Sequence, residues 1–250
     1  MTPENLSNDL PSWLEPVRAG AEAITAEDLT RFLPPDDAEP RRGAVLILFA
    51  DGAGHDLETG AVLLTERAHQ MRSHPGQVSF PGGSIDPGET AVAAALREAQ
   101  EEIGLDPGSV EVFGRLPELW LPPSNFSVTP VLGWWREPSP VHVVDPGEVH
   151  AIHLVPLADL LRADHRIQVR APSGWVSPAY LIGPARDVIL WGFTAGVLTR
   201  LFDYLGWAAP WEDYEVRDLP AYMLQGGPRT AAAPAATTVA ETGTTTASGD

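Results

Sequence analysis

The distribution of apolar residues in the first half of the chain predicts a β-sheet. Residues 44–50 form a continuous apolar run of the kind found in buried strands, and the polar, glycine-rich segment 51–60 after it is typical of a turn. We therefore expect residues 61–65 to return as the hairpin partner of the first strand. A further short strand is expected at 78–80, directly before a loop that begins at Pro81.

A helix is predicted after this loop, from about Glu89 or Thr90 to Ile103. An acidic side chain suits the exposed amides at a helix start, and Gly104 provides the stop. The core-facing side of this helix is expected to consist of the apolar residues that recur at helical spacing, namely Val92, Leu96, Ala99 and Ile103. The sheet therefore begins well before the helix.

The second half of the chain continues the mixture of strands and helices. Strands are expected at 110–113, 127–135, 151–155, 167–170 and 175–182. Helices are expected at 157–161, where Pro156 opens the first turn, and at 188–205. The apolar side of the second helix, interpreted as core packing, consists of Val197, Leu198, Leu201, Phe202 and Leu205.

The two ends of the chain differ from its middle. Thr25 is the expected N-cap of a helix with Asp28 in a weak capping box, and the apolar side of this helix would be Leu29, Phe32 and Leu33. Prolines then mark a linker, and after Tyr222 the sequence turns to Ala, Thr, Gly and Pro, with too little apolar surface to offset ordering. We expect an N-terminal helical extension and linker at 1–40, a domain at 41–225 and a disordered tail at 226–250.

Charge and composition narrow the class of protein. The 250 residues include 16 Lys and Arg and 34 Asp and Glu, and the formal net charge of −18 opposes binding to nucleic acid or to an anionic membrane. A small anionic substrate stays compatible, because a local cation and a few arginines can reverse the field in a cleft. Without cysteine, disulfides, a thiol nucleophile and thiolate metal sites are excluded. The chain has no apolar run of membrane-spanning length and no signal pattern, so we expect a cytoplasmic protein.

Three carboxylates gather on one face of the helix predicted to end at Ile103. Glu98, Glu101 and Glu102 share a narrow face at roughly 100° per residue, away from the apolar side. On an arbitrary helix such a face is usually only solvated surface. Here Arg97 lies beside Glu98 and four residues before Glu101, where it can orient a carboxylate. With the carbonyls of the glycine loop nearby, the cluster suits a hard divalent cation such as Mg2+ held against a phosphate.

This segment resembles the signature of the Nudix hydrolases, G-x5-E-x7-R-E-U-x-E-E-x-G-U, where U is apolar. The matching positions are Gly83, Glu89, Arg97, Glu98, Ala99, Glu101, Glu102, Gly104 and Leu105. The resemblance implies an α/β (α+β) Nudix fold, in which a mixed β-sheet is sandwiched between helices. It also implies that Glu98, Glu101 and Glu102 bind Mg2+ or Mn2+, with a carbonyl of Gly82 or Gly83 as a further candidate ligand.

The stretch before the helix resembles the element L-L-T-x-R-[SA]-x3-R-x3-G-x3-F-P-G-G of the coenzyme A pyrophosphatase branch of the same family. The matching positions are Leu63, Leu64, Thr65, Arg67, Ala68, Arg72, Gly76, Phe80, Pro81, Gly82 and Gly83. The resemblance implies that Phe80, Gly82 and Gly83 belong to a substrate-binding element in which Arg67 and Arg72 hold substrate phosphates. Without this motif, surface ion pairs explain both arginines at least as well.

One later glutamate is a further candidate for the active site. Glu148 lies in a Pro-x-Glu-Val segment, at a place that resembles where Nudix enzymes often add a glutamate near the metals. An exposed surface position is the alternative. In the implied reaction Glu98 and Glu148 are both candidates for the base that activates water, and Arg97 orients the cluster.

These interpretations lead to one function and two alternatives. The leading function is metal-dependent cleavage of the diphosphate of coenzyme A or acyl-coenzyme A to 3′,5′-ADP and (acyl-)4′-phosphopantetheine. The second is a Nudix hydrolase of another nucleoside diphosphate derivative, such as ADP-ribose, a nucleoside diphosphate sugar or a dinucleotide, which a substrate panel distinguishes. A non-catalytic Nudix-like sensor is disfavoured, because such proteins can lose the glutamates that this chain keeps, and no basic patch accompanies them. The sequence does not specify the oligomeric state.

Overall fold

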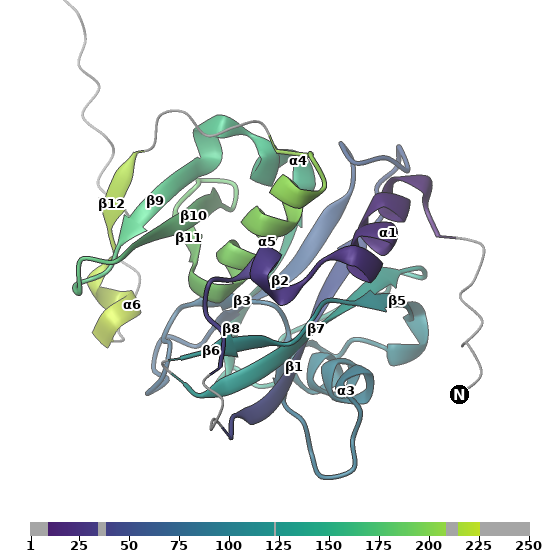
Figure 1. Ribbon diagram of the computed structural model, residues 1–250, viewed down its shortest axis with the longest axis horizontal. Helices are drawn as coiled ribbons and strands as arrows, with labels where there is room; N and C mark the ends of the chain where they lie inside the picture. Colours follow the sequence, from purple (N-terminus) through teal and green to yellow (C-terminus); the bar gives the residue numbers. More distant parts are fainter. Residues whose placement is uncertain (1–9, 35–38, 123, 209–214, 226–250) are drawn as a thin grey trace, which may run out of the picture.

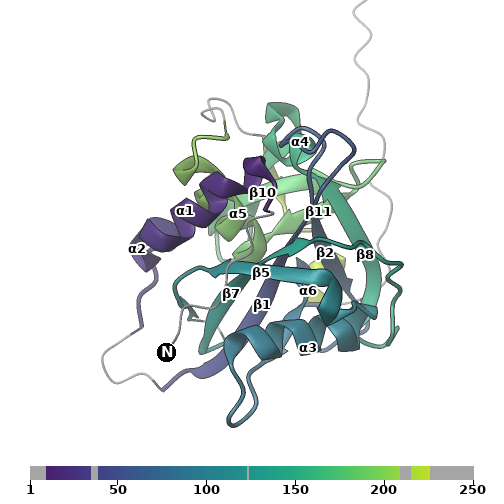
Figure 2. The same cartoon turned by 90° about the vertical axis from the view of Figure 1, so that its right-hand side faces the viewer.

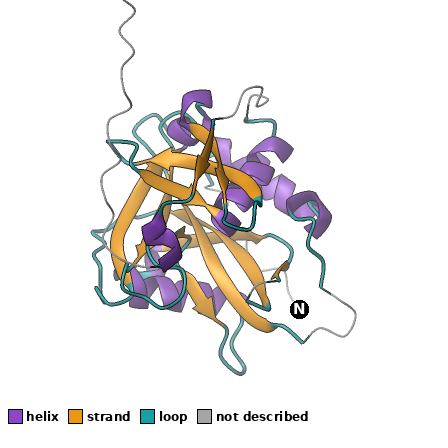
Figure 3. Cartoon of the chain, turned by 90° about the vertical axis from the view of Figure 1, so that its left-hand side faces the viewer, coloured by secondary structure: helices purple, strands orange, loops and turns teal. Residues whose placement is uncertain are grey.

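The computed structural model describes residues 10–34, 39–122, 124–208 and 215–225, which form two β-sheets with helices around them (Figure 1 and Figure 3). The larger sheet has the order β3–β2–β1–β7–β5, while β4, β6 and β8 pair with β1, β7 and β2. Its strands are β1 (Arg41–Ala50), β2 (Ala61–Arg67), β3 (Val78–Ser79), β4 (Gly82–Ser84), β5 (Val110–Arg115), β6 (Leu119–Leu121), β7 (Phe126–Trp135) and β8 (Val149–Pro156). The sheet is mixed, because β1 and β7 are parallel whereas β1 and β2 form the predicted antiparallel pair.

The central strand β1 has apolar side chains on both faces of the sheet. Leu46 and Leu48 pack with helix α3 (Ala91–Ile103), whereas Ile47 and Phe49 belong to a hydrophobic cluster on the opposite side. That cluster includes residues of α1 (Glu15–Ala23), α4 (Leu157–Leu161) and α5 (Gly192–Tyr204). Figure 2 shows α3 and α1 on opposite sides of β1 and β7. The predicted mixed sheet between helices is therefore confirmed.

A smaller sheet shares the second of these clusters. It has the order β11–β10–β9–β12, formed by β9 (Arg166–Arg170), β10 (Val176–Ile182), β11 (Val188–Trp191) and β12 (Val216–Asp218). One face of β10 packs with α5, and its other face packs with α6 (Ala221–Gln225). Two of these strands, β9 and β10, were predicted, but their separation from the larger sheet was not.

The segment 188–205, predicted as one helix, is a strand followed by a helix. Residues Val188–Trp191 form a hairpin with β10, in which Val188 lies opposite Ile182. Gly192 follows with a φ of 72°, and α5 begins there. Four apolar residues in a row fit a strand and a helix equally well, so the sequence pattern alone does not distinguish the two. Pairing with β10 makes this segment a strand. The apolar side of α5 is as predicted, because Val197, Leu198, Leu201 and Phe202 are buried and Leu205 is partly buried.

The loop predicted from its glycine content contains a short strand instead, because β4 pairs with β1. A second short strand that was not predicted, β6, pairs with β7. Strands this short give no periodic signal, and they form because a longer neighbouring strand offers free hydrogen-bonding groups.

The helix α3 has both predicted ends. Thr90 is the N-cap, and its Oγ1 accepts a hydrogen bond from the backbone nitrogen of Ala93 at 3.1 Å. Gly104 follows the last turn in the left-handed conformation with a φ of 66°. The packing face differs from the prediction. It consists of Ala91, Ala94, Ala95, Ala99 and Ile103, whereas Val92 and Leu96 are only partly buried.

The N-terminal segment carries more structure than was predicted. Thr25 and Asp28 form the expected capping box of α2 (Ala26–Leu29), but Phe32 and Leu33 lie beyond its end and are exposed. Before it, the short 3-10 turn η1 (Ser12–Leu14) leads into α1, which the apolar pattern did not single out. The tail predicted at 226–250 lies outside the described residues. Among the described helices, none has the length and apolar character needed to span a membrane.

Candidate active site

The glycine loop before α3 runs against the central strand of the larger sheet. Gly82 and Gly83 lie in β4, opposite Val45 and Ala44 of β1. A Cβ atom on Gly82 would lie 2.3 Å from the carbonyl oxygen of Ala44, and the φ of this residue is 154°. Glycine is therefore required at this position for the two backbones to approach. The loop also contacts α3, which places the helix beside it.

Two glutamates of α3 lie against this loop. The backbone nitrogen of Gly82 donates a hydrogen bond to Oε2 of Glu102 at 3.3 Å. The carboxylate of Glu98 lies so close to Gly83 that an added Cβ atom would be 2.5 Å from its Oε1. The side chain of Glu101 is 60% exposed and lies at the outer edge. The structure thus brings Glu98 and Glu102 together at the loop and leaves Glu101 beside them in solvent.

Arg97 is at the centre of the ion pairs on this helix. Its Nη1 donates to Glu98 Oε1 and to Glu101 Oε2, both at 3.0 Å. Its Nε and Nη2 donate to the two oxygens of Glu89 at 3.0 and 3.1 Å, and Nη2 also donates to the carbonyl of Ser84 at 3.0 Å. These are the contacts that the predicted orienting role requires. The pairing with Glu89 was not predicted, although Glu89 is a fixed position of the signature.

Burial opposes negative charge on Glu102. It raises the pKa of Glu102 to about 8, although the hydrogen bond from Gly82 lowers this pKa. The charges of Glu98 and Glu148 raise the same pKa, and the charge of Arg67 lowers it. In the cation-free protein the Glu102 carboxyl is therefore largely protonated at neutral pH.

The pKa of Glu98 is also raised, mainly by burial. The hydrogen bond and the charge of Arg97 lower this pKa, while the charges of Glu101 and Glu148 raise it. Burial, together with the neighbouring carboxylates, therefore outweighs Arg97 and disfavours negative charge on Glu98.

Glu148 reaches the cluster because β8 pairs with β2. Its backbone carbonyl accepts a hydrogen bond from the nitrogen of Ala68 at 2.8 Å, directly before β8 begins. The carboxylate is exposed, yet it acts on both Glu98 and Glu102. Glu148 is therefore both an exposed residue and a neighbour of the glutamate cluster, because it lies at the rim of that cluster.

The residues of the predicted substrate-binding element lie in different places. Arg67, at the end of β2, lies near enough to Glu102 for its positive charge to lower the pKa of that carboxyl. Its Nε is buried and has no hydrogen-bond acceptor among the described residues. Arg72 is exposed in the loop 68–77 and has no ion pair with the glutamates among the described residues. The Phe80 side chain is buried in the cluster that contains α5, so it contributes to the core.

The donor set fits a hard divalent cation. Glu98 and Glu102 are partly withdrawn from water, and their carboxylates disfavour each other's charge, which a cation between them would reverse. Carboxylate and backbone oxygens are the ligands that Mg2+ and Mn2+ take. Glu98 and Glu102 would hold such an ion, with Glu101 and Glu148 close enough to add charge.

A glycine loop beside a helix of glutamates, on a mixed sheet, is an arrangement that can hold a divalent cation against an anionic substrate. The NUDIX domain model matches residues 40–175, which is more than half of the chain. The chain therefore belongs to the Nudix hydrolase family. The predicted Nudix fold is confirmed, and membership of this family supports the predicted enzyme class, a hydrolase of pyrophosphate bonds.

Several curated relatives carry the same family name. Nudix hydrolase 15, mitochondrial, of Arabidopsis thaliana is 38% identical over 174 residues, covering 66% of this chain and 59% of that protein. The Uncharacterized Nudix hydrolase NudL of Enterobacter sp. (strain 638) is 36% identical over 204 residues, covering 73% of this chain and 96% of that protein. The chain thus spans about three-fifths of the first relative and nearly all of the second. A solved Nudix hydrolase from M. smegmatis, RenU, covers 70% of this chain and 91% of its own at 21% identity and a TM-score of 0.46.

Proposed function

We propose that the protein is a Mg2+- or Mn2+-dependent pyrophosphohydrolase that cleaves the diphosphate of coenzyme A or acyl-coenzyme A. The products would be 3′,5′-ADP and (acyl-)4′-phosphopantetheine. The observation that carries this proposal is the position of Arg67, which belongs to the coenzyme A-type element and acts on Glu102 of the Nudix helix. The buried Nε of Arg67 has no acceptor among the described residues, and a substrate phosphate oxygen would supply one.

In this proposal the side chains position the substrate and a water molecule. The water attacks one phosphorus atom of the diphosphate, the bond from that phosphorus to the bridging oxygen breaks, and the bridging oxygen leaves on the other phosphate. Glu98 or Glu148 accepts the proton that the water loses. Arg67 holds a phosphate oxygen, and Arg72 reaches the substrate from its loop.

The remaining residues prepare the site for the cation. Arg97 fixes the orientation of Glu98 through its 3.0 Å hydrogen bond. When bound by Glu98, Glu101 and Glu102, Mg2+ or Mn2+ supplies neutralisation of the phosphate oxygens and a more acidic water. The absence of a side chain on Gly82 and Gly83 lets the loop backbone pack against β1 and against the Glu98 carboxylate.

The proposal also covers the domain that carries the activity, its compartment and its partners. We propose that residues 41–225 form the hydrolase domain and that it acts in the cytoplasm on a small diphosphate. The net charge of −18 supports the absence of nucleic-acid and membrane partners.

The substrate assignment is tested by incubating the purified full-length protein with coenzyme A and Mg2+ and identifying the products by mass spectrometry. We expect 3′,5′-ADP and 4′-phosphopantetheine in equal amounts. Efficient cleavage of ADP-ribose or another nucleoside diphosphate derivative, with coenzyme A left intact, would show that the proposed substrate is wrong. The assignment to the Nudix hydrolase family would still hold.

Matched variants test the roles of the residues in the same assay. Glu102→Gln should lose orders of magnitude in kcat with little change in folding, because it removes a buried ligand. Glu101→Gln should lose less, since Glu101 is exposed.

Arg67→Lys should raise KM for coenzyme A more than Arg72→Lys does, because a lysine cannot replace the guanidinium fork at a buried site. Equal effects of the two lysine substitutions would contradict the special role of Arg67.

A further inference from the structure

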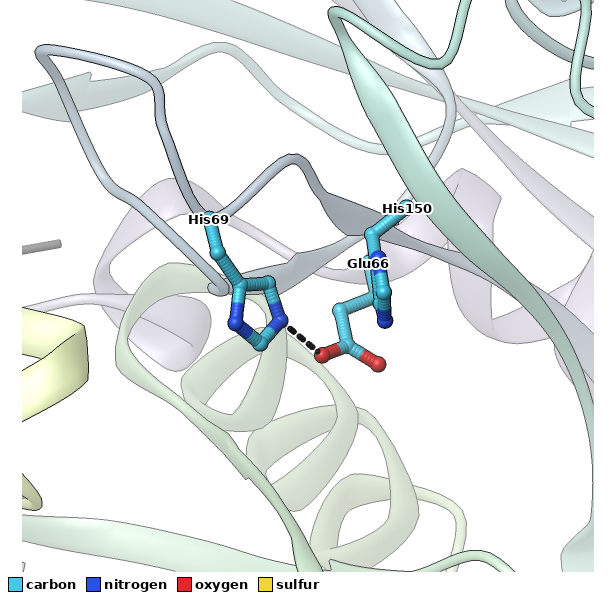
Figure 4. Close-up of side chains that lie close together, drawn as sticks. All are labelled: Glu66, His69 and His150. Atoms are coloured by element: carbon cyan, nitrogen blue, oxygen red, sulfur yellow. Dashed lines mark hydrogen bonds and ion pairs between the residues drawn. The ribbon is translucent and has the colours of Figure 1, made fainter. Parts of the chain in front are cut away.

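A second group of metal-binding residue types lies near the end of β2, outside the glutamate cluster. Glu66 belongs to β2, His69 follows in the loop 68–77, and His150 belongs to β8. One ligand atom of each residue lies within 4.8 Å of the other two. Figure 4 shows the three side chains close together, with Nε2 of His69 2.7 Å from Oε1 of Glu66.

Glu66 is a fully buried carboxylate with histidines at both oxygens. Its exposed fraction is 0%, and its Oε2 lies 3.0 Å from Nε2 of His153. His69 is buried as well, and its ring stacks on Tyr222 of α6 with centroids 5.4 Å apart. A carboxylate so far from water requires positive charge or strong hydrogen-bond donors beside it.

Two imidazole rings lie together beside this carboxylate. The centroids of the His69 and His150 rings are 4.5 Å apart. A single divalent ion would neutralise Glu66 while both histidines stay neutral, which is the form in which histidine is a ligand. Two imidazoles with one carboxylate suit zinc and similar transition ions, whereas Mg2+ prefers oxygen ligands alone.

We propose that Glu66, His69 and His150 bind one divalent transition ion of the Zn2+ class. Ligands about 2.1 Å from a zinc ion lie roughly 3.4 Å from one another in a tetrahedral site. In this structure the ligand atoms lie within 4.8 Å of one another, so side-chain rotation would bring them to that spacing when an ion binds. His153, on the other oxygen of Glu66, is a positioning residue that holds the carboxylate in place.

The new site is distinct from the glutamate cluster and lies close enough to support it. The adjacent residues Glu66 and Arg67 have different partners, since Glu66 contacts histidines and Arg67 acts on Glu102. An ion at the new site would join β2, the loop 68–77 and β8. It would therefore hold the strand end that carries Arg67 and the loop that carries Arg72, as a structural metal would.

The test uses the full-length Glu102→Gln protein, in which the glutamate site is impaired, and Co2+ as a visible probe of the new site. After metal removal, the protein is titrated with Co2+ in excess Mg2+, and bound Co2+ is followed by its visible absorption. We expect one equivalent of Co2+, displaced by Zn2+ and not by Mg2+, and a higher Tm with the ion bound.

Histidine variants in the same background decide whether the named residues are the ligands. His150→Ala should abolish the absorption while the far-UV circular dichroism is unchanged, because His150 is exposed. His153→Gln should weaken binding by about 10–100-fold. The matched control is His55→Ala, an exposed histidine paired with Asp51 in another turn, which should bind Co2+ normally. No bound Co2+ in excess Mg2+, or normal binding by His150→Ala, would overturn the proposal.

Discussion

Glu102 is a side chain on which burial and metal binding make opposite demands. Burial raises its pKa from the ordinary 4.5 to about 8, whereas a metal ligand must be deprotonated. Between these two pH values the folded, cation-free protein binds more protons than the unfolded chain. The contribution of Glu102 to stability is therefore full below about pH 4.5 and is lost as the pH rises through about 8.

This proton gives a prediction for the pH dependence of stability. In the presence of a chelator, the Tm of the wild-type protein should fall between about pH 5 and pH 9 relative to that of Glu102→Gln, which has no proton to lose there. Calorimetry over this range measures the difference. Parallel Tm curves for the two proteins would show that Glu102 ionises normally in the folded state.

Gly83 gives a second prediction at the scale of one residue. Gly83→Ala places a methyl group 2.5 Å from the Glu98 carboxylate, which must then move from the loop. We expect a large loss of kcat with a nearly unchanged Tm, because the carboxylate is the flexible end of its side chain. Steady-state kinetics and thermal unfolding separate the two effects.

Gly196→Ala is the matched control for this substitution. Gly196 lies within α5, and nothing lies within 4 Å of an added Cβ. Alanine should stabilise the helix by up to about 1 kcal/mol and leave activity unchanged. Similar losses of activity in both variants would mean that the contact between Gly83 and Glu98 is not what matters.

At the scale of elements, the sequence predicted α3 and its site because every local signal agreed. Thr90, Gly104 and the spacing of the glutamates are properties of consecutive residues, so no distant contact was needed to interpret them. The face on which α3 packs differs from the predicted one. Alanines of α3 are buried against β1, whereas Val92 and Leu96, which were expected there, are only partly buried. Which apolar residue is buried depends on the opposing surface, and that surface is not encoded locally.

Features formed by pairing between distant segments were beyond prediction from sequence. β4 exists because β1, a longer strand from an earlier part of the chain, lies beside it. The group of Glu66, His69 and His150 forms only when β8 pairs with β2. Glu148 was nevertheless named as an active-site candidate from the sequence, because its Pro-x-Glu-Val segment resembles a position known in the family. Residue spacing alone would not have indicated it.

The capping residue of α3 gives a prediction at this scale. Thr90→Ala removes the hydrogen bond that Thr90 accepts from Ala93 and should cost about 1 kcal/mol of unfolding free energy. Thr90→Ser keeps the hydroxyl and should cost much less. Activity at low temperature should stay near normal in both, because the glutamates lie in the middle and last turns of the helix. Chemical denaturation followed by kinetics checks both statements, and equal unfolding free energies for the two variants would contradict the capping role.

At the scale of the whole molecule, one hydrophobic cluster joins segments that are far apart in the sequence. Leu14 and Val17 of the N-terminal segment are fully buried in the same cluster as Ile47 of β1 and Leu198 of α5. We had expected residues 1–40 to be an extension of a domain that begins at residue 41. The shared cluster leads us to propose that residues 10–29 unfold together with that domain.

Trp13 tests this proposal without removing the segment. Its ring is buried against Phe49, and its Nε1 donates a hydrogen bond to Asp51 at 3.1 Å. Trp13→Ala should lower the unfolding free energy by about 3–5 kcal/mol in one cooperative transition, because it leaves a cavity in the common cluster. Deletion of residues 227–250 is the control and should change neither stability nor activity, since that composition buries little apolar surface. If Trp13→Ala left the main transition in place and lost only a minor early one, the N-terminal segment would be a separate unit, because its packing would not contribute to the stability of the domain.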